Sequence, residues 1–322
     1  MLPHPKGLHH DHIDGSIAVA DIIADLYALR EMAFPFPSRE AWIAFMQDSS
    51  VNIVKRFSTV TNVLQTREAL RRLGYAYGKR RATEGYEYIE GKFAPQYHTK
   101  DGLSLKEVAD AMIEGLRAAE KEHEIQIVPV ICIGREATPA QGIEIAKVVL
   151  EYEGEAVLDL ACDEPGNPPE KHLPAYRLTF GTKVRRDCHA GEWVSPEPKE
   201  NYFERLTKNL RTAIFDLKCH SVGHAIPLGQ NSDLVDYAAA EGIRITGCPL
   251  SNLALGHVKD LRELKIDYLL DKGVIYTLNP DDDLFLPAMP KVLRVCDEAY
   301  GFTESHCRAL EENVFRGALR QS

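Results

Sequence analysis

The segment SLKEVADAMIEGLRAAEKEHEIQIVPVIC, residues 104–132, decides the fold class of this chain. In its first part, apolar side chains recur at three- and four-residue spacing, at Leu105, Val108, Met112 and Leu116. This spacing predicts a helix with one apolar face. The run IQIVPVIC that follows, residues 125–132, is apolar apart from one glutamine, which is typical of a strand buried on both faces. A helix that leads directly into such a strand is a building unit of parallel α/β sheets.

The same strand type recurs along the chain, and helical patterns separate most of the runs. Eight strands are predicted, over residues 7–13, 86–94, 125–132, 156–161, 183–189, 219–225, 243–248 and 274–279. Alternating β and α elements favour a parallel sheet with covering helices, and eight such units fit a closed barrel better than an open sheet. The sequence therefore predicts an α/β fold, a single (β/α)8 TIM barrel.

Two stretches lie outside this repeat. Residues 17–84, between the first two strands, are mostly helical in pattern and predict a helical insertion over one end of the barrel. Residues 290–319 predict C-terminal helices. The proline-rich stretch 163–174 is interpreted as a loop after the fourth strand and not as a domain linker. We expect one domain over residues 1–322.

The composition narrows the functional class. The chain has 322 residues, with 38 Lys and Arg against 48 Asp and Glu, and a formal net charge of −10. No basic block stands out, so neither nucleic acid nor a membrane surface is an expected partner. No run of about 18 or more apolar residues predicts a transmembrane helix, and the first residues lack the apolar core of a signal peptide. The seven cysteines are widely spaced without a CxxC motif, which indicates reduced thiols in a cytoplasmic protein.

Side chains that bind metal ions occur at the ends of four predicted strands, where the active sites of such barrels lie. His10 and His12 are two residues apart in a strand and so share one face. The other strand ends carry His189, His224 and the run Asp281–Asp283. Each of these taken alone is more often a hydrogen-bonded structural residue or a solvated loop. Four strand ends with such residues on one face of the barrel together predict a metal site.

The candidate ligands favour zinc, because three imidazoles and one carboxylate suit a borderline ion that keeps an open position for water. These ligands are His10, His12, His189 and Asp281. Such an ion lowers the pKa of its water to about 7. Glu192 lies three residues after a predicted ligand, where it could protonate a substrate atom. His224 and Asp282 are candidates to orient or deprotonate the water.

Two absent features refine the prediction. The chain has no PCxxC motif, so it does not have the fold of the zinc deaminases that carry that motif. Two-metal barrels of related architecture place a bridging lysine at the end of the fourth strand, and the run AVLDLACDE at residues 156–164 contains no lysine. One zinc ion per chain is therefore expected.

Six motifs, spread over nearly the whole chain, resemble those of the adenosine deaminase branch of the amidohydrolase superfamily. HDHIDGS at residues 10–16 resembles the family's HxHLDG[AS], and HAGE at residues 189–192 matches its pattern letter for letter. The others are VGHA at 222–225 (IGHG), CPLSN at 248–252 (CPTSN), LNPDDD at 278–283 (xNTDDP) and KFAPQYHT at 92–99 (RFAPQLHT of bacterial members). One such motif is a weak signal, whereas the whole set is very specific.

The resemblance implies a zinc-dependent hydrolytic deaminase that converts adenosine or 2′-deoxyadenosine to the inosine-type product and ammonia. Zinc would be held by His10, His12, His189 and Asp281. Glu192 would protonate N1 of the purine, and His224 and Asp282 would position the hydroxide that attacks C6. Asp14 matches the residue that contacts the ribose. The substrate is expected to meet His12, Asp14, Cys162 and Asp282.

Departures from the family pattern cluster where the substrate would lie. Cys162 stands where members usually carry a glycine whose backbone N–H meets purine N3, so a side chain enters the site there. The other departures are Ala225 where the family has glycine, Pro280 where it has threonine, Asp283 where it has proline, and Lys92 and Ser221 where it has arginine. The predicted ligands and acid are unchanged, so deaminase chemistry is better supported than adenosine as the substrate.

Several alternatives stay open at the level of sequence. Enzymes of the free base tend to have HIEGT where this chain has HIDGS, so Asp14 and Ser16 favour a nucleoside. Adenine, aminodeoxyfutalosine and N6-methyl-AMP are the alternative substrates. A hydrolase of a ring amide or ester is disfavoured because an acid three residues after the HAGE histidine suits ring protonation. A catalytically silent binding protein would have lost a ligand or the acid. The oligomeric state is open, a homo-oligomer included.

Overall fold

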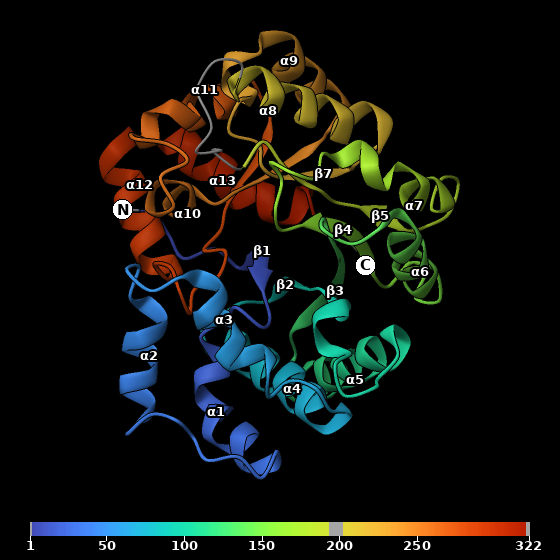
Figure 1. Cartoon of the computed structure of the whole chain (residues 1–322). Coiled ribbons are helices and arrows are strands. Elements are labelled where there is room, and N and C mark those ends of the chain that lie inside the picture. The colour runs from blue at the N-terminus through green and yellow to red at the C-terminus, as the bar shows by residue number, and fades with distance from the viewer. Residues whose placement is uncertain (1, 193–201, 320–322) are drawn as a thin grey trace.

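The computed structural model describes residues 2–192 and 202–319, in which short parallel strands alternate with helices (Figure 1). The strands are β1 (Gly7–His12), β2 (Tyr88–Phe93), β3 (Gln126–Gly134), β4 (Val157–Ala161), β5 (Arg185–Arg186), β6 (His189–Ala190), β7 (Ser221–His224), β8 (Arg244–Gly247) and β9 (Ile275–Leu278). β1 to β5 pair in chain order in one sheet, and β6 to β9 pair in chain order in a second. All of these pairs are parallel, as the alternating pattern predicts.

The two sheets join into one ring because β5 and β6 are successive pieces of one strand. The backbone N–H of Asp187 donates to Leu158 of β4 at 2.8 Å, and the N–H of His220 donates to Arg186 at 2.8 Å. β6 then pairs with β7. The ring therefore has eight strand positions, the number that the sequence predicts.

The ring closes where β1 meets the segment after β9, and we call this join the seam. The N–H of Asp281 donates to the carbonyl of His10 at 3.3 Å, beside an isolated parallel bridge between Asp11 and Asp281. Asn279 adds to the seam, because its side-chain oxygen accepts from the N–H groups of His9 and His10 at 2.9 and 3.1 Å. The first and last strands of the chain are thus held edge to edge.

The continuous strand predicted over residues 183–189 is wrong, because the structure interrupts it at Asp187 and Cys188. The Asp187 carboxylate accepts the N–H of Cys188 at 2.9 Å and the ammonium of Lys92 at 2.6 Å. The Asp187 carbonyl accepts the hydroxyl of Tyr176 at 2.6 Å. Side chains therefore take over backbone hydrogen bonds that a regular strand would make with its neighbours.

Helices follow most strands and cover the outside of the ring (Figure 1). They are α5 (Leu105–His123), α6 (Pro139–Leu150), α7 (Leu173–Leu178), α8 (Tyr202–Arg211), α9 (Ser232–Glu241), α10 (Pro249–Ala254) and α11 (Ile266–Asp271). Shorter turns are η1 (Pro95–His98), η2 (Pro169–His172), η3 (Thr212–Asp216), η4 (Leu228–Gln230) and η5 (Leu261–Leu264). α5 begins at the predicted position, where Ser104 and Glu107 form a capping box.

The insertion consists of α1 (Ala18–Leu29), α2 (Arg39–Gln47), α3 (Ile53–Thr61) and α4 (Arg67–Thr83), which lie together at one side of the barrel (Figure 1). Trp42 of α2 is fully buried and donates to Thr59 at 3.0 Å, so it belongs to the core of the insertion. α12 (Met289–Tyr300) and α13 (Glu304–Arg316) form the predicted C-terminal helices. No described helix is long and apolar enough to span a bilayer.

Paired charges fill part of the barrel interior. Arg244 of β8 donates to both carboxylate oxygens of Glu90 of β2, at 2.6 and 2.5 Å. Lys92 of β2 donates to Asp159 of β4 at 3.0 Å and to Asp187 at 2.6 Å. All five side chains are buried. Buried charges require such partners, since an unpaired ion in the interior is strongly destabilising.

Candidate metal centre and active site

The four predicted metal ligands converge at the carboxyl ends of the strands. His10 and His12 belong to β1, His189 to β6, and Asp281 follows β9. His12 Nε2 lies 3.2 Å from His189 Nε2 and 3.4 Å from Asp281 Oδ1. His10 Nε2 lies 3.6 Å from the same Oδ1. Four potential ligand atoms therefore surround one point.

These separations fit an ion of the size of zinc. Zn–N and Zn–O bonds of about 2.0–2.2 Å place neighbouring ligand atoms about 3.3–3.6 Å apart. His10 Nε2 is buried and has no hydrogen-bond partner among the described residues, as expected of an atom whose partner is an ion. The Cys248 thiol also lies near this group, but burial raises its pKa, which disfavours the thiolate that zinc would require.

A second set of side chains fixes the orientation of these ligands. His189 Nδ1 donates to the Asp159 carboxylate at 3.0 Å, which leaves Nε2 to face the other ligands. His10 Nδ1 lies 3.0 Å from Thr246 Oγ1. The hydroxyl of Ser251 donates to Asp281 Oδ2 at 2.7 Å and leaves Oδ1 free. Partners of this kind set the tautomer and direction of metal ligands.

Burial keeps the β1 imidazoles neutral. It lowers the pKa of His12 to about 4 and the pKa of His10 well below its ordinary value. Neutral imidazole is the form that binds metal ions. Gly223 of β7 leaves room for the His10 ring, because a Cβ at that position would lie 2.6 Å from His10 Cε1.

Glu192 and His224 face each other beside the four ligands, with His224 Nε2 3.5 Å from Glu192 Oε1. Burial raises the pKa of Glu192 to about 8, so the carboxyl group is predisposed to carry a proton. The loop that carries it is held because Glu164 accepts the N–H groups of Gly191 and Glu192, at 3.0 and 2.9 Å. A carboxyl group with a raised pKa thus lies beside the cluster of candidate ligands.

His224 is oriented as a proton acceptor. Its Nδ1 donates to the side-chain oxygen of Asn252 at 2.9 Å. Its Nε2 is then the unprotonated nitrogen, and this atom is buried without a hydrogen-bond partner among the described residues. His224 and Ala225 both have left-handed backbone conformations, with φ of 61° and 48°. Such strained backbone is found at functional sites.

Asp282 completes the acidic side of the site. A carboxylate oxygen of Asp282 lies within 4.8 Å of possible ligand atoms of His12 and Asp281. Burial, followed by the charges of Asp281 and Asp14, raises the pKa of Asp282 well above its ordinary value. Gly15 is required for this packing, because a Cβ there would lie 1.6 Å from Asp282 Oδ1. The glycine of the HDHIDGS motif therefore makes space for a carboxyl group from the other side of the seam.

Asp14 lies next to these residues and is held by His98. The Nε2 atom of His98 is 3.2 Å from Asp14 Oδ2, and its Nδ1 is 3.0 Å from the carbonyl of Leu64. From the sequence, His98 is expected to be a simple loop residue. That expectation is wrong, because His98 ends η1 and is completely buried against Asp14.

Cys162 follows β4 with a φ of 79°, a left-handed conformation that favours glycine. The hydroxyl of Tyr97 lies 3.2 Å from Cys162 Sγ and also contacts the Glu136 carboxylate. Burial raises the pKa of Cys162 to about 12, and the nearby carboxylates of Glu136, Glu192 and Asp14 contribute to this rise. The thiol therefore lies between Tyr97 and the acidic groups of the site.

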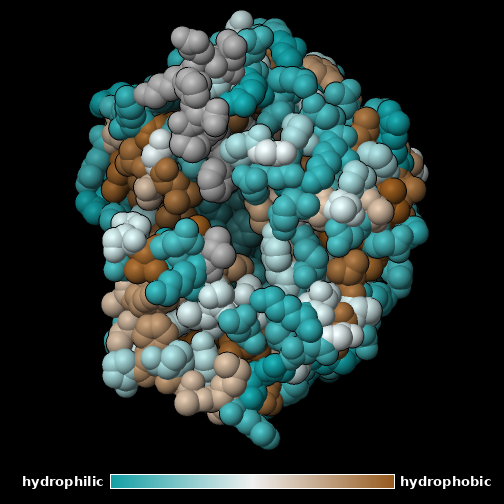
Figure 2. Space-filling view, in the orientation of Figure 1, coloured by the Kyte–Doolittle hydropathy of each residue, from teal (hydrophilic) through white to brown (hydrophobic). Residues whose placement is uncertain are grey.

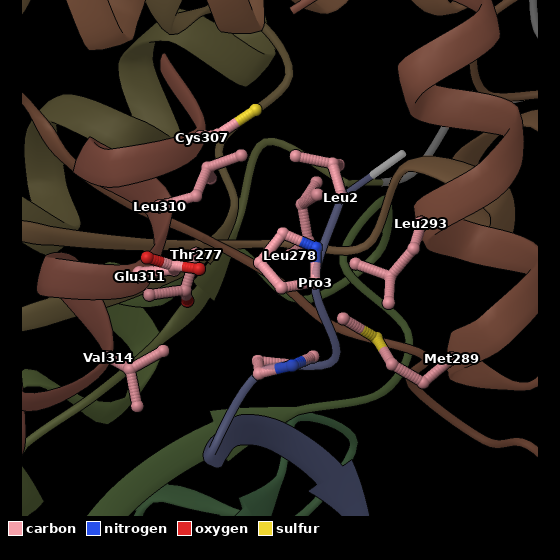
Figure 3. A pocket seen from close by; sticks show the side chains of 11 residues that line it. Leu2, Pro3, Thr277, Leu278, Met289, Leu293, Cys307, Leu310, Glu311 and Val314 are labelled. Carbon is pink, nitrogen blue, oxygen red and sulfur yellow. The ribbon is translucent and has the colours of Figure 1, made fainter. Parts of the chain in front are cut away.

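The space-filling view shows a hollow near the centre of the face seen in Figure 1, with mostly hydrophilic residues in and around it (Figure 2). A different, apolar pocket lies between the first residues of the chain, β9, α12 and α13 (Figure 3). Its lining includes Leu2, Pro3, Met289 and Leu310, and none of the predicted site residues. The cluster of polar groups at the strand ends is therefore the stronger candidate for a reaction site.

Sequence reasoning missed the residues that support this cluster. Ser251 and Asn252 lie within the CPLSN motif, but the resemblance of this motif to the family pattern indicates no role for its polar side chains. Asp159 lies in the middle of the apolar run AVLDLA, and an acid in a buried strand is a signal that could have indicated it. Thr246 gave no signal that distinguishes it from an ordinary strand residue.

Known proteins that are similar to this chain include adenosine deaminases and adenine deaminases. The sequence model of the family described as adenosine deaminase matches residues 5–321. An adenosine deaminase of Streptomyces coelicolor is 29% identical over 343 residues, covering 98% of this chain and 82% of the relative. An adenine deaminase of Emericella nidulans is 26% identical over 335 residues, covering 98% and 88%.

Solved structures of similar fold confirm the barrel. An adenine deaminase from Arthrobacter aurescens has a TM-score of 0.82 at 22% identity, covering 98% of this chain and 94% of the other. An amidohydrolase from Burkholderia ambifaria with bound Zn has a TM-score of 0.81 at 22% identity, covering 98% and 85%. The N6-methyl-AMP deaminase of Arabidopsis thaliana has a TM-score of 0.78 at 20% identity, covering 98% and 92%. With its match from residue 5 to residue 321, the chain belongs to the adenosine deaminase family, whose members are hydrolytic deaminases acting on C–N bonds.

Proposed function

We propose that this protein is a zinc-dependent deaminase of a 6-aminopurine nucleoside, adenosine or 2′-deoxyadenosine, that releases ammonia. The observation that carries the proposal is the convergence of three imidazoles and the Asp281 carboxylate around one point, beside Glu192 and His224. The ligands would be His10, His12, His189 and Asp281, with one ion per chain. The family match over residues 5–321 supports a single domain that acts as a unit.

We infer a role for each remaining group. Zinc, when bound, would act as a Lewis acid and lower the pKa of water. His224 offers its unprotonated Nε2 to accept a proton from that water, because Asn252 holds the proton on Nδ1. Glu192, whose pKa is raised by burial, would deliver a proton to N1 of the purine, which makes C6 electrophilic. Asp282 would be a second acceptor that orients the water.

The charges around the site favour an uncharged nucleoside as the substrate. Asp14 matches the residue that contacts the ribose, so a 5′-phosphate beside its carboxylate would meet a like charge. Asp14, held by His98, is a hydrogen-bond acceptor suited to a sugar hydroxyl, and His12, Cys162 and Asp282 would complete the contacts. Adenine is the second candidate, because several relatives at 26–28% identity are named adenine deaminases.

One experiment tests the assignment. The purified protein is assayed for ammonia release with adenosine, 2′-deoxyadenosine, adenine, N6-methyl-AMP and aminodeoxyfutalosine, and its zinc content is measured by elemental analysis. The proposal expects the nucleosides to be turned over most efficiently, with one zinc per chain. A metal-free protein inert toward all five compounds would support the binding protein instead.

Cys162→Gly is expected to raise kcat/KM for adenosine by about tenfold, the scale on which small changes of pocket volume act. Glycine accepts the left-handed backbone at this position without strain, so the fold is expected to tolerate the change. Relative rates are measured for adenosine and 2′-deoxyadenosine. Cys162→Ala should give an intermediate rate if volume is the cause, and unchanged relative rates would show that the thiol does not shape the pocket.

Asn252→Ala is expected to lower kcat about tenfold or more while zinc content stays at one per chain. The change removes the acceptor that holds the proton of His224 on Nδ1, so the ring can adopt the other tautomer. Steady-state rates and elemental analysis check the result. Asn62→Ala, at an exposed amide paired with Lys100, is the control and should be neutral. Full activity of Asn252→Ala would remove Asn252 from the proposed mechanism.

A further inference from the structure

A buried arginine from outside the barrel spans the seam. Arg81, near the end of α4, donates through Nε and Nη2 to the two carboxylate oxygens of Asp11, at 2.8 and 2.9 Å. Through Nη1 and Nη2 it donates to the two oxygens of Asp283, at 2.9 and 3.0 Å. Asp11 lies on β1 and Asp283 follows β9, so one guanidinium binds a carboxylate on each side of the seam. This is the paired, planar geometry for which arginine is suited.

Neighbouring groups fix both carboxylates further. Tyr77 of α4 donates its hydroxyl to Asp11 at 2.6 Å, and the N–H of Ile17 donates to Asp283 at 2.8 Å. Arg81 itself is 1% exposed, and the two aspartates are buried. Each carboxylate therefore accepts three hydrogen bonds in a dry environment, where its position is well defined.

The two aspartates are interleaved with the proposed zinc ligands. Asp11 lies between His10 and His12 on β1, and its side chain points to the opposite face of the strand. Asp283 lies two residues after Asp281. The guanidinium therefore binds both of the chain segments that supply three of the four proposed ligands, and it does so on the side away from those ligands. A shift of the seam would change the distance of 3.4 Å between His12 Nε2 and Asp281 Oδ1.

We propose that Arg81 is a positioning residue that sets the zinc affinity of the site by fixing β1 against the segment after β9. The inference rests on the proposed zinc site. It also gives a role to Asp283, which departs from the proline of the family pattern. The helical insertion is thereby connected to the metal centre through α4, which supplies both Arg81 and Tyr77.

The test compares zinc affinity with stability in three variants. Zinc dissociation constants are measured by competition with a chromogenic chelator, and thermal unfolding is followed for the metal-free proteins. Arg81→Lys keeps the charge but cannot bind both carboxylates in the same way. Asp283→Asn removes the charge of one of the two carboxylates that Arg81 binds, which weakens the contact on that side of the seam. The triple variant Arg81→Met, Asp11→Asn and Asp283→Asn removes the three buried charges together, which buried ion clusters often tolerate. It leaves Glu84, the partly exposed carboxylate that also pairs with Arg81 at 2.7 Å.

We expect all three variants to bind zinc about tenfold or more weakly, the scale seen when outer partners of a metal site are removed. Arg80→Met is the matched control, since Arg80 precedes Arg81 on the same helix and pairs at the surface with Glu84 and Asp21. Variants with lowered stability but wild-type zinc affinity would overturn the proposal and leave Arg81 a purely structural residue. If the wild-type protein itself bound no zinc, the proposed function would fail first.

Discussion

Asp281→Ala and His10→Ala are expected to abolish zinc binding and deaminase activity together, with zinc content near zero and kcat reduced to background. Each change removes one of the four atoms that surround the proposed ion, at separations of 3.2–3.6 Å. Three remaining protein ligands in an otherwise open site hold zinc less firmly, and without the ion the water keeps its ordinary pKa. Elemental analysis and the adenosine assay measure the two losses.

The control for this prediction is another histidine and aspartate pair. The partly buried His306 of α13 and the exposed Asp271 of α11 lie 2.9 Å apart, and neither is a proposed site residue, so His306→Ala should leave zinc content and rate unchanged. Circular dichroism and thermal unfolding show whether each variant is folded. An Asp281→Ala protein that retains one zinc and normal turnover would contradict the assignment of the ligands. Excess zinc in the assay separates weakened binding from a lost catalytic role.

Glu192→Gln is expected to keep zinc at one per chain and to lower kcat by about 10²-fold or more, the scale of general acid catalysis. Glutamine has nearly the same shape and can donate a hydrogen bond, but it cannot transfer a proton to N1 of the purine. Glu192 is not one of the four proposed ligands, and its Oε1 lies 3.5 Å from Nε2 of His224, which is not a proposed ligand either. The metal site should therefore survive the change.

Zinc content and single-turnover rates distinguish a lost acid from a damaged site. Glu144→Gln, at an exposed carboxylate paired with Lys147 on α6, is the matched control and should be neutral. A near wild-type rate for Glu192→Gln would exclude ring protonation by this residue. A variant that has also lost its zinc would instead assign Glu192 a structural part in the metal centre.

The barrel could be predicted because its physical signal is local. Parallel strands that are covered on both sides appear as short apolar runs, and the helices between them carry one apolar face. Residues 183–189 are the exception, because Asp187 replaces strand pairing by side-chain hydrogen bonds to Lys92 and Cys188. That rearrangement depends on Lys92, which is 95 residues away from Asp187 in the sequence, so the local sequence pattern does not indicate it.

The convergence of the candidate ligands could be predicted because each lies near a strand end, where the fold itself gathers side chains. Their supporting partners could not be found in this way. Asp159 of β4 and Thr246 of β8 contact His189 and His10, which lie on other strands, and such contacts depend on side-chain directions that only the folded chain defines. His98 was underestimated for the same reason, since its partner Asp14 is 84 residues away in the sequence.

The buried pair of Glu90 and Arg244 has a consequence for how this chain diverges from its relatives. Loss of either partner leaves an uncompensated ion inside the barrel, which costs about 3–5 kcal/mol, whereas exchange of both for apolar residues of similar volume is often neutral. Positions 90 and 244 are therefore expected to change together during evolution. Descendants that keep one charge should keep the other, even though 154 residues separate them along the chain.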